Sequence, residues 1–397
     1  MEVQIRALRA SELDAAFDLD VDAFHHAESG RDRFRRFVDP AGVMGAFDGD
    51  RLVAMTVSLP FGQFFGGRAV PMGGVESVAV VPDARGRGLA KQVTRACIDA
   101  MRERGEAISS LFPATTSLYR ALGWELGGNY VIRKLAPRLL HDLPRPERGR
   151  ARPATAADHD AIRACYAGFA RTANGCLDRH DHWWGRRLDA WRDRQVFVFE
   201  AEGGAVEGYL VYRQADGEWS HLGGDFAISV DEIVTGTRDA GLCLWGLLAS
   251  WATQVAQIWC HGGGDDPILL VLPEQVFETL AEIRWMTRVL DAAVAVAARG
   301  FPAGLDVEVP LRIRDDIVAA NGGGFVLTVQ KGEGRLAPAP RAAGPHLDVR
   351  GFSSLYTGFS STAALARAGL LAGGSAGERA ALDAAFGGPT PWLIDEF

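Results

Sequence analysis

The sequence lacks the cysteine spacing that marks disulfide-rich proteins and thiolate metal sites. Its five cysteines are odd in number, widely separated and without a Cys-x-x-Cys pair, which argues against a disulfide framework and against zinc bound by thiolates. We interpret them as small core side chains or as residues without a role in the site. They are Cys97, Cys165, Cys176, Cys243 and Cys260.

Long apolar runs and an excess of positive charge are also missing. No run approaches the roughly 20 residues of a membrane-spanning helix, and the N-terminus shows no basic-then-apolar signal pattern. We therefore expect a cytoplasmic protein without a membrane partner. The net charge of −8 argues against a nucleic-acid-binding surface and would favour encounter with cations.

The composition is that of a folded protein with several domains. Hydrophobic residues make up 48% and charged residues 23% of the 397 residues, which is typical of globular chains. At roughly 100 to 200 residues per domain, two to four domains are expected. We predict an α/β (α+β) protein with domains at residues 1–145, 146–283 and 284–397.

Each predicted domain has its own pattern. In the first, residues 43–47 and 51–59 flank Asp48-Gly49-Asp50, which predicts a hairpin. A proline- and arginine-rich connector at 136–153 precedes a second α/β pattern with a helix at 238–256 and a strand at 268–272. From about residue 284 the pattern changes to the alternating strands and helices of an α+β domain.

A strand, a glycine-rich turn and a helix follow one another in the first domain. Residues 75–81 are rich in β-branched side chains, Pro82 ends the pairing, and helical apolar spacing begins at Leu89. Gly86 and Gly88 carry no Cβ, so backbone N–H groups at the helix start can approach phosphate oxygens. The simpler interpretation is a crossover whose glycines only permit a tight turn.

The order of these elements, with Arg85-x-x-Gly88-x-Ala90 after the central strand, resembles the GNAT acetyltransferase superfamily. The resemblance implies that this turn binds the pyrophosphate of acetyl-CoA and that the motif strand splays from its neighbour to receive the pantetheine. It assigns the pantetheine contacts to Val78, Ala79 and Val80. It assigns the phosphates to Gly86, Arg87, Gly88, Leu89, Ala90 and Lys91, with Arg85 adding a cationic donor. By the same alignment, Ala114 and Thr115 border the cofactor.

The whole chain is similar to the enhanced intracellular survival (Eis) family. That resemblance implies a functional GNAT domain, a degenerate GNAT-like domain and a sterol-carrier-like domain, assembled as a homohexamer. It rests on Trp285-Met-Thr-Arg-Val-Leu-Asp, on Leu382-Asp-Ala-Ala-Phe and on the tail that ends in Phe397. The chain departs from the best-known relatives at His25 and His26, where they carry an acidic residue, so the choice of polyamine substrate is open.

The resemblance implies a general acid and a general base. The sequence 118–124, Leu-Tyr-Arg-Ala-Leu-Gly-Trp, is similar to the superfamily helix whose tyrosine places a phenol near the thioester sulfur, which makes Tyr119 the acid. A tyrosine hydroxyl bonded to a backbone carbonyl is the structural alternative. The base implied is the terminal carboxylate of Phe397, with its ring anchored in an apolar wall; Glu76 on the motif strand is the second candidate, and a frayed terminus is the alternative.

Two further features carry less weight. Asp395, Glu396 and the terminal carboxylate could attract a polycation, or could simply be solvated charges at a chain end. The sequence 180–182, His-Asp-His, lacks a third ligand at a sensible spacing, so we interpret it as a surface loop and expect no metal.

The function expected is an acetyl-CoA-dependent N-acetyltransferase that acts on primary amines, either small aminoglycoside-like polyamines or the lysine side chains of peptides. The alternatives are a non-catalytic protein that senses CoA and carries lipid in the third domain's groove, and a structural scaffold. Release of free thiol that depends on an added amine would separate the enzyme from both.

Overall fold

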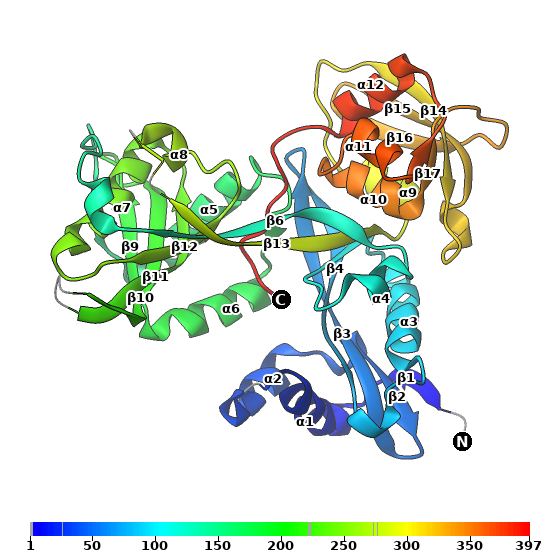
Figure 1. Cartoon of the computed structure of the whole chain (residues 1–397), viewed down its shortest axis with the longest axis horizontal. Coiled ribbons are helices and arrows are strands. Elements are labelled where there is room, and N and C mark those ends of the chain that lie inside the picture. The colour runs from blue at the N-terminus through cyan, green and yellow to red at the C-terminus, as the bar shows by residue number, and fades with distance from the viewer. Residues whose placement is uncertain (1–2, 26, 221–223, 273, 276) are drawn as a thin grey trace. The chain divides into compact units, whose positions relative to one another are not determined.

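The computed structural model describes residues 3–25, 27–220, 224–272, 274–275 and 277–397, and the chain divides into two compact units (Figure 1). The first unit contains residues 1–128, 284–389 and 396–397, and the second contains residues 129–283 and 390–395. Strands β6 (Glu125–Leu135) and β13 (Glu278–Val289) contribute residues to both. Among the described residues, no helix combines the length and the apolar character needed to cross a membrane.

The first unit contains a sheet in the order β1-β2-β3-β4-β5-β13-β6. Strands β1 to β4 pair antiparallel in sequence order, β4 pairs parallel with β5, and β5 pairs antiparallel with β13. The hairpin predicted around Asp48-Gly49-Asp50 is confirmed as the β2–β3 turn, where Gly49 has φ +63°. The strands are β1 (Gln4–Ala7), β2 (Val43–Asp48), β3 (Arg51–Phe65), β4 (Arg68–Val80) and β5 (Ile108–Leu111).

Helices pack on this sheet through apolar stripes. In α3, Leu89, Val93, Cys97 and Met101 recur every fourth residue and are all buried, as expected for one face of a helix. Helix α1 lies on the other side of strands β3 and β4 from α3 (Figure 1). The helices of this region are α1 (Leu13–Phe24), α2 (Arg31–Phe37), α3 (Leu89–Glu103) and α4 (Thr116–Arg120).

The rest of the first unit is an α+β region with a sheet in the order β16-β15-β14-β17-β18. Its interior holds Arg299, which is 1% exposed and whose guanidinium lies within about 5 Å of the rings of Phe301, Tyr356 and Phe386. Burial lowers the pKa of Arg299 to about 10. The strands are β14 (Val307–Arg314), β15 (Gly323–Gln330), β16 (Glu333–Pro338), β17 (His346–Asp348) and β18 (Leu371–Ala372). The helices are α9 (Ala292–Ala298), α10 (Val349–Thr357), α11 (Thr362–Arg367) and α12 (Ala376–Phe386).

The second unit contains a sheet in the order β6-β12-β11-β10-β9-β7. Helix α7 packs on it through Leu244, Trp245 and Leu248, which are buried with the strand residues Leu210 and Ile228. The strands are β7 (Arg150–Pro153), β8 (Leu177–Asp178), β9 (Gln195–Glu200), β10 (Val206–Ser220), β11 (Gly224–Thr235) and β12 (Ile258–Gly262). The helices are α5 (His159–Ala170), α6 (Asp181–Ala190), α7 (Arg238–Ala249) and α8 (Ile268–Val271).

The strand predicted at Ile268–Leu272 is wrong. This segment forms the short helix α8, which begins after Pro267 and whose first N–H, that of Ile268, donates to the Asp266 carboxylate at 3.0 Å. A run of four or five apolar residues fits a buried strand and a buried helical turn equally well. The Asp-Pro pair at its start is the signal that favours the helix.

Candidate active site

The turn between β4 and α3 has the backbone geometry that the glycine pattern predicts. Gly86 has φ +79° and Gly88 has φ +73°, a region that favours glycine. A Cβ at Gly86 would meet no atom within 4 Å, so the space beside this glycine is open. No side chain caps α3 among the described residues, and its first N–H groups are therefore left for another acceptor.

Cationic side chains surround this turn. Arg85, Arg87 and Lys91 are exposed. Arg85 Nε donates to the Val80 carbonyl at 3.4 Å, and Arg87 Nη1 lies 3.7 Å from an Asp48 carboxylate oxygen. These contacts are long and exposed, so an anion could draw both guanidinium groups towards the turn. The N-terminal end of α3 adds a favourable dipole for negative charge.

Strand β4 leaves β5 before the turn, while its pairing with β3 continues to Val80. Its parallel pairing with β5 joins Met72–Gly74 to Ile108–Ser110 among the described residues, so Val78–Val80 lie beyond the last pair. On the other edge, the register with β3 shifts opposite Ser77, which has φ +51°. A bulge of this kind bends a strand, and the two features together free the β5-side edge of β4.

The last residue of the chain lies against this part of β4. The ring of Phe397 is 5.3 Å from that of Phe61 and 6.1 Å from that of Phe112, centroid to centroid. A Cβ at Gly74 would lie 2.8 Å from the Phe397 ring. A side chain at residue 74 would therefore displace Phe397, because Cβ atoms do not approach a neighbour that closely.

Tyr119 lies on the short helix α4 and is 6% exposed. It packs in one apolar cluster with Val75 of β4, Leu111 of β5 and Trp124. Burial raises the pKa of Tyr119 to about 12. No hydrogen bond to its hydroxyl is found within the described parts of the chain, so the structural alternative of a phenol tied to a backbone carbonyl has no support.

Tyr119 and Phe397 lie on opposite faces of the same pair of strands. Tyr119 packs with Val75 and Leu111, whereas Phe397 packs at the preceding residue of β4, Gly74, and at Phe112 immediately after β5. Successive residues of a strand face opposite sides. Both side chains therefore meet β4 and β5 where their pairing ends, one from each face, and the alternation puts Glu76 on the face of Phe397.

The segment that precedes Phe397 is anchored in the second unit. Leu393 and Ile394 are buried, and the Asp395 carboxylate is fully buried. Asp395 accepts hydrogen bonds from Arg179 Nε at 3.0 Å and from Trp183 Nε1 at 2.9 Å. The interpretation of Asp395 as a solvated charge or an attractor of polycations is wrong, because its carboxylate is buried and paired with Arg179.

The Asp395 site is part of a larger buried network of charges. Arg179 also donates to both oxygens of Glu232 at 2.8 and 3.0 Å, and Arg187 pairs with Glu232 as well. Burial raises the pKa of Glu232, but Arg179 and Arg187 outweigh it and bring the value to about 2. Two arginines thus face two carboxylates, and the network is neutral as a whole.

We expect Asp395→Ala to destabilise the second unit by about 3 to 5 kcal/mol, because it leaves a buried positive charge without its partner. Urea unfolding followed by tryptophan fluorescence would measure the shift, since Trp183 lies in the network. Arg192→Ala is the matched control, because it removes an exposed ion pair with Asp189 in the same unit and should leave the transition where it is. Equal transitions for the two variants would contradict the assignment of Asp395 as an anchor.

The structure also places the remaining residues that the sequence analysis singled out. Thr115 is the N-cap residue of α4 and, like Ala114, is exposed at the end of the loop that follows β5. His25 ends α1 in a left-handed conformation, with φ +57°, and His26 lies outside the described residues. His180 caps α6, its ring nitrogen accepting from the Trp183 N–H at 3.2 Å.

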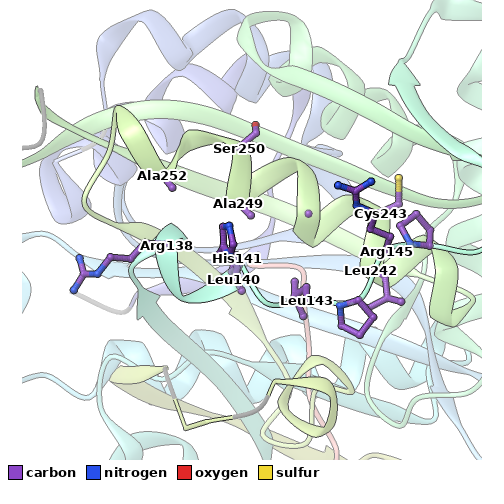
Figure 2. Close-up of a pocket in the computed structure, with 13 residues that line it drawn as sticks. Arg138, Leu140, His141, Leu143, Arg145, Leu242, Cys243, Ala249, Ser250 and Ala252 are labelled. Atoms are coloured by element: carbon purple, nitrogen blue, oxygen red, sulfur yellow. The ribbon is translucent and has the colours of Figure 1, made fainter.

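A pocket of about 560 Å³ lies in the second unit, between the predicted connector and α7 (Figure 2). Arg138, His141 and Arg145 line it from the connector, and Leu242 and Cys243 line it from α7. None of the site residues predicted from the sequence belongs to it, so its volume does not bear on the chemistry of Tyr119 and Phe397.

The sequence analysis did not identify the residues that contact the last residue of the chain. Phe61 on β3 and Phe112, which follows β5, contact Phe397 from segments that are far apart in sequence. The available signal was the pair Gly73-Gly74 at the head of a β-branched strand, because glycine inside a strand often marks the close approach of another group.

Comparison with known proteins gives matches along most of the chain. A model of an acetyltransferase (GNAT) domain matches residues 4–127, another with the same description matches residues 175–289, and a model of a sterol carrier protein domain matches residues 292–394. The matches follow the order of domains predicted from the sequence, and they confirm the predicted fold of two domains of one type followed by a third of another.

Individual relatives match over most of the chain. An uncharacterised N-acetyltransferase of Streptomyces griseus is 28% identical and aligns with 92% of this chain and 91% of its own. N-acetyltransferase Eis of Mycobacterium tuberculosis is 25% identical, over 87% and 86% of the two chains. The crystal structure of a GCN5-related N-acetyltransferase from Kribbella flavida is 31% identical, covers 100% of this chain and 98% of its own, and superposes with a TM-score of 0.87.

Proposed function

Because the chain belongs to the GNAT superfamily of N-acetyltransferases and is similar to its Eis members, we propose that it transfers acetyl from acetyl-CoA to primary amines. In this proposal Tyr119 is the general acid and the terminal carboxylate of Phe397 is the general base. The acceptors are small polyamines of the aminoglycoside kind or lysine side chains of peptides.

The residues around β4 and α3 suit acetyl-CoA. The diphosphate would be held by the N–H groups of residues 86–91, with Arg85 and Arg87 as cationic donors. The freed edge of Val78–Val80 offers backbone groups to the amides of the pantetheine arm. Acetyl-CoA, when bound, supplies the acetyl group as a thioester, which an amine can attack without a metal ligand from the protein.

The two proton carriers have separate tasks. The amine nitrogen forms the new bond to the acetyl carbon and gives up a proton, which the Phe397 carboxylate accepts directly or through water. The carbon–sulfur bond breaks, and the sulfur takes a proton from the hydroxyl of Tyr119. With a pKa of about 12, Tyr119 stays protonated over the whole pH range in which amines with pKa values near 10 become nucleophilic.

One observation carries the proposal: Tyr119 and Phe397 meet β4 and β5 from opposite faces, at the residues where the pairing of the two strands ends. A substrate carbonyl located between β4 and β5, beyond their last paired residues, would have an acid on one side and a base on the other. Glu76 shares the face of Phe397 and is the second candidate for the base. It is half-buried.

The alternative of a lipid carrier has less support. A carrier needs an apolar cavity, but the interior of the sterol-carrier-like region holds the buried guanidinium of Arg299 among the rings of Phe301, Tyr356 and Phe386. Among the described residues Arg299 donates to the carbonyls of Gly300 and Tyr356 and has no carboxylate partner, and such a buried charge is a poor neighbour for an acyl chain.

The test is release of free thiol from acetyl-CoA in the presence of an amine panel. We expect thiol release that depends on primary amines and increases with pH as the acceptor loses its proton. Tertiary amines and alcohols of similar size are the matched controls, because they cannot give a stable amide. Thiol release that is absent with every amine, while acetyl-CoA binds, would favour the CoA-sensing alternative.

A further inference from the structure

The helix that carries Tyr119 is too short to fix its own position. It contains five residues, Thr116–Arg120, whereas isolated helices of fewer than about 12 residues are marginal in water. The place of the phenol is therefore set by the groups that α4 and the turn after it touch. In the first unit, many of those groups belong to the sterol-carrier-like region at residues 292–394, hereafter the third domain.

Glu125 joins α4 to the third domain through two arginines. Its carboxylate accepts hydrogen bonds from Arg120 at 2.7 and 3.1 Å, and from Arg350 Nε at the start of α10 at 3.0 Å. Arg120 is the residue directly after Tyr119. Burial raises the pKa of Glu125, but the hydrogen bonds from Arg120 and Arg350 outweigh it, so the pKa lies below its usual range and the carboxylate stays charged.

The turn after α4 packs against a second arginine, Arg288. Gly123 has φ +94°, and a Cβ there would lie 1.6 Å from Arg288 Nη1 and 3.1 Å from a methyl carbon of Val349. Arg288 is fully buried and is held by Asp315, to which its Nη2 donates at 2.9 and 3.0 Å. Asp315 in turn accepts from the N–H of Val318 at 3.0 Å. This side of the turn therefore packs against a buried side chain that is held by an ion pair.

Apolar side chains of the third domain complete the support. Val318, which is 3% exposed, belongs to the same cluster as Tyr119, Leu122 and Trp124, and Ile317 packs against it. The phenol thus has an apolar backing from the third domain, and the only charged link from that domain to α4 among the described residues is the Arg350–Glu125–Arg120 chain.

We propose that the third domain positions the acid of the transfer reaction, with Arg350 and Glu125 as positioning residues that hold Tyr119 through Arg120. The inference rests on the proposed function, because it gives the charge network a task only if the phenol acts on the leaving sulfur. Neither Arg350 nor Glu125 has to touch a substrate. A shift of the phenol by a fraction of an ångström is enough to affect the rate, since misplacement by 1 Å can cost about 100-fold.

The test is a double-mutant cycle between Arg350→Gln and Tyr119→Phe. We expect Arg350→Gln to lower kcat about 10-fold or more with little change in the KM for acetyl-CoA, and to have no further effect once Tyr119 is already Phe. Arg350→Lys, which keeps the charge but not the two-pronged geometry, should recover part of the loss. A loss of the same size in both backgrounds would overturn the positioning role.

Arg68→Gln is the matched control for the cycle. Arg68 on β4 pairs with Glu333 of the third domain at 3.4 Å, so it also joins the two regions but does not touch α4. We expect wild-type kcat for this variant; a loss equal to that of Arg350→Gln would contradict the proposal. The proposed function has a separate test. Full activity of the Tyr119→Phe protein would show that Tyr119 is not the general acid, whatever the effect of Arg350→Gln.

Discussion

A protein extended by a single glycine after Phe397 should lose transfer activity by at least about 100-fold and still bind acetyl-CoA. The extension leaves the ring of Phe397 free to stay between Phe61 and Phe112, but it moves the terminal carboxylate by about 3.8 Å, the length of one residue. General-base assistance contributes about 100- to 10,000-fold and requires hydrogen-bond reach. Thiol release measures transfer, and calorimetry measures acetyl-CoA binding.

The matched control adds the same glycine at the N-terminus and should leave both quantities unchanged. Removal of Phe397 is a second variant with a distinct expectation, because it takes away the ring as well as moving the carboxylate, and it should be at least as harmful. Full turnover by the protein with the C-terminal glycine would rule out the terminal carboxylate as base. Glu76, on the same face of β4, would then be tested by Glu76→Gln.

Replacement of Tyr119 by Phe should lower kcat by about 100- to 10,000-fold, the range for loss of a general acid. The KM for acetyl-CoA should change little, because the ring that packs with Val75 and Leu111 is kept. Stability should be unchanged or slightly higher, since the hydroxyl has no hydrogen-bond partner among the described residues and its loss leaves no other group without a partner.

The pH dependence of kcat gives a second check on Tyr119. Its raised pKa, about 12, means that the phenol keeps its proton up to about pH 11, so the Tyr119→Phe change should lower the rate by the same factor from pH 6 to pH 10. A wild-type rate that falls between pH 8 and pH 10, in a way abolished by Tyr119→Phe, would show that the phenol titrates there and would contradict the burial effect.

Local patterns predicted the strand, turn and helix of the cofactor region well. The shift from β-branched residues to helical spacing at Leu89 and the glycines at 86 and 88 are all read within one short segment, and each reflects a backbone preference of the residues themselves. The same holds for the hairpin at Gly49. Where the local pattern was ambiguous, as at Ile268–Leu272, the prediction failed.

The groups that hold the site could not be predicted in the same way. Asp395 is buried by pairing with Arg179, more than two hundred residues earlier, and Glu125 meets Arg350 from a different domain. A carboxylate near a chain end is solvated unless a partner of opposite charge has been buried beside it. The sequence alone shows which residues are charged. It does not show which of them form ion pairs or become buried, because both depend on the fold.

The buried Asp395 has a consequence for the lifetime of the enzyme. Within the described residues, the hydrogen bonds that hold the tail end at Asp395, two residues before the terminus. Glu396 is exposed, and Phe397 is held by its ring contacts with Phe61 and Phe112. A carboxypeptidase that trims the last two residues would therefore remove ring contacts but no buried ion pair, so the folded core would stay intact while the proposed catalytic group is lost. Such trimming would appear as lost turnover in a preparation of normal melting temperature.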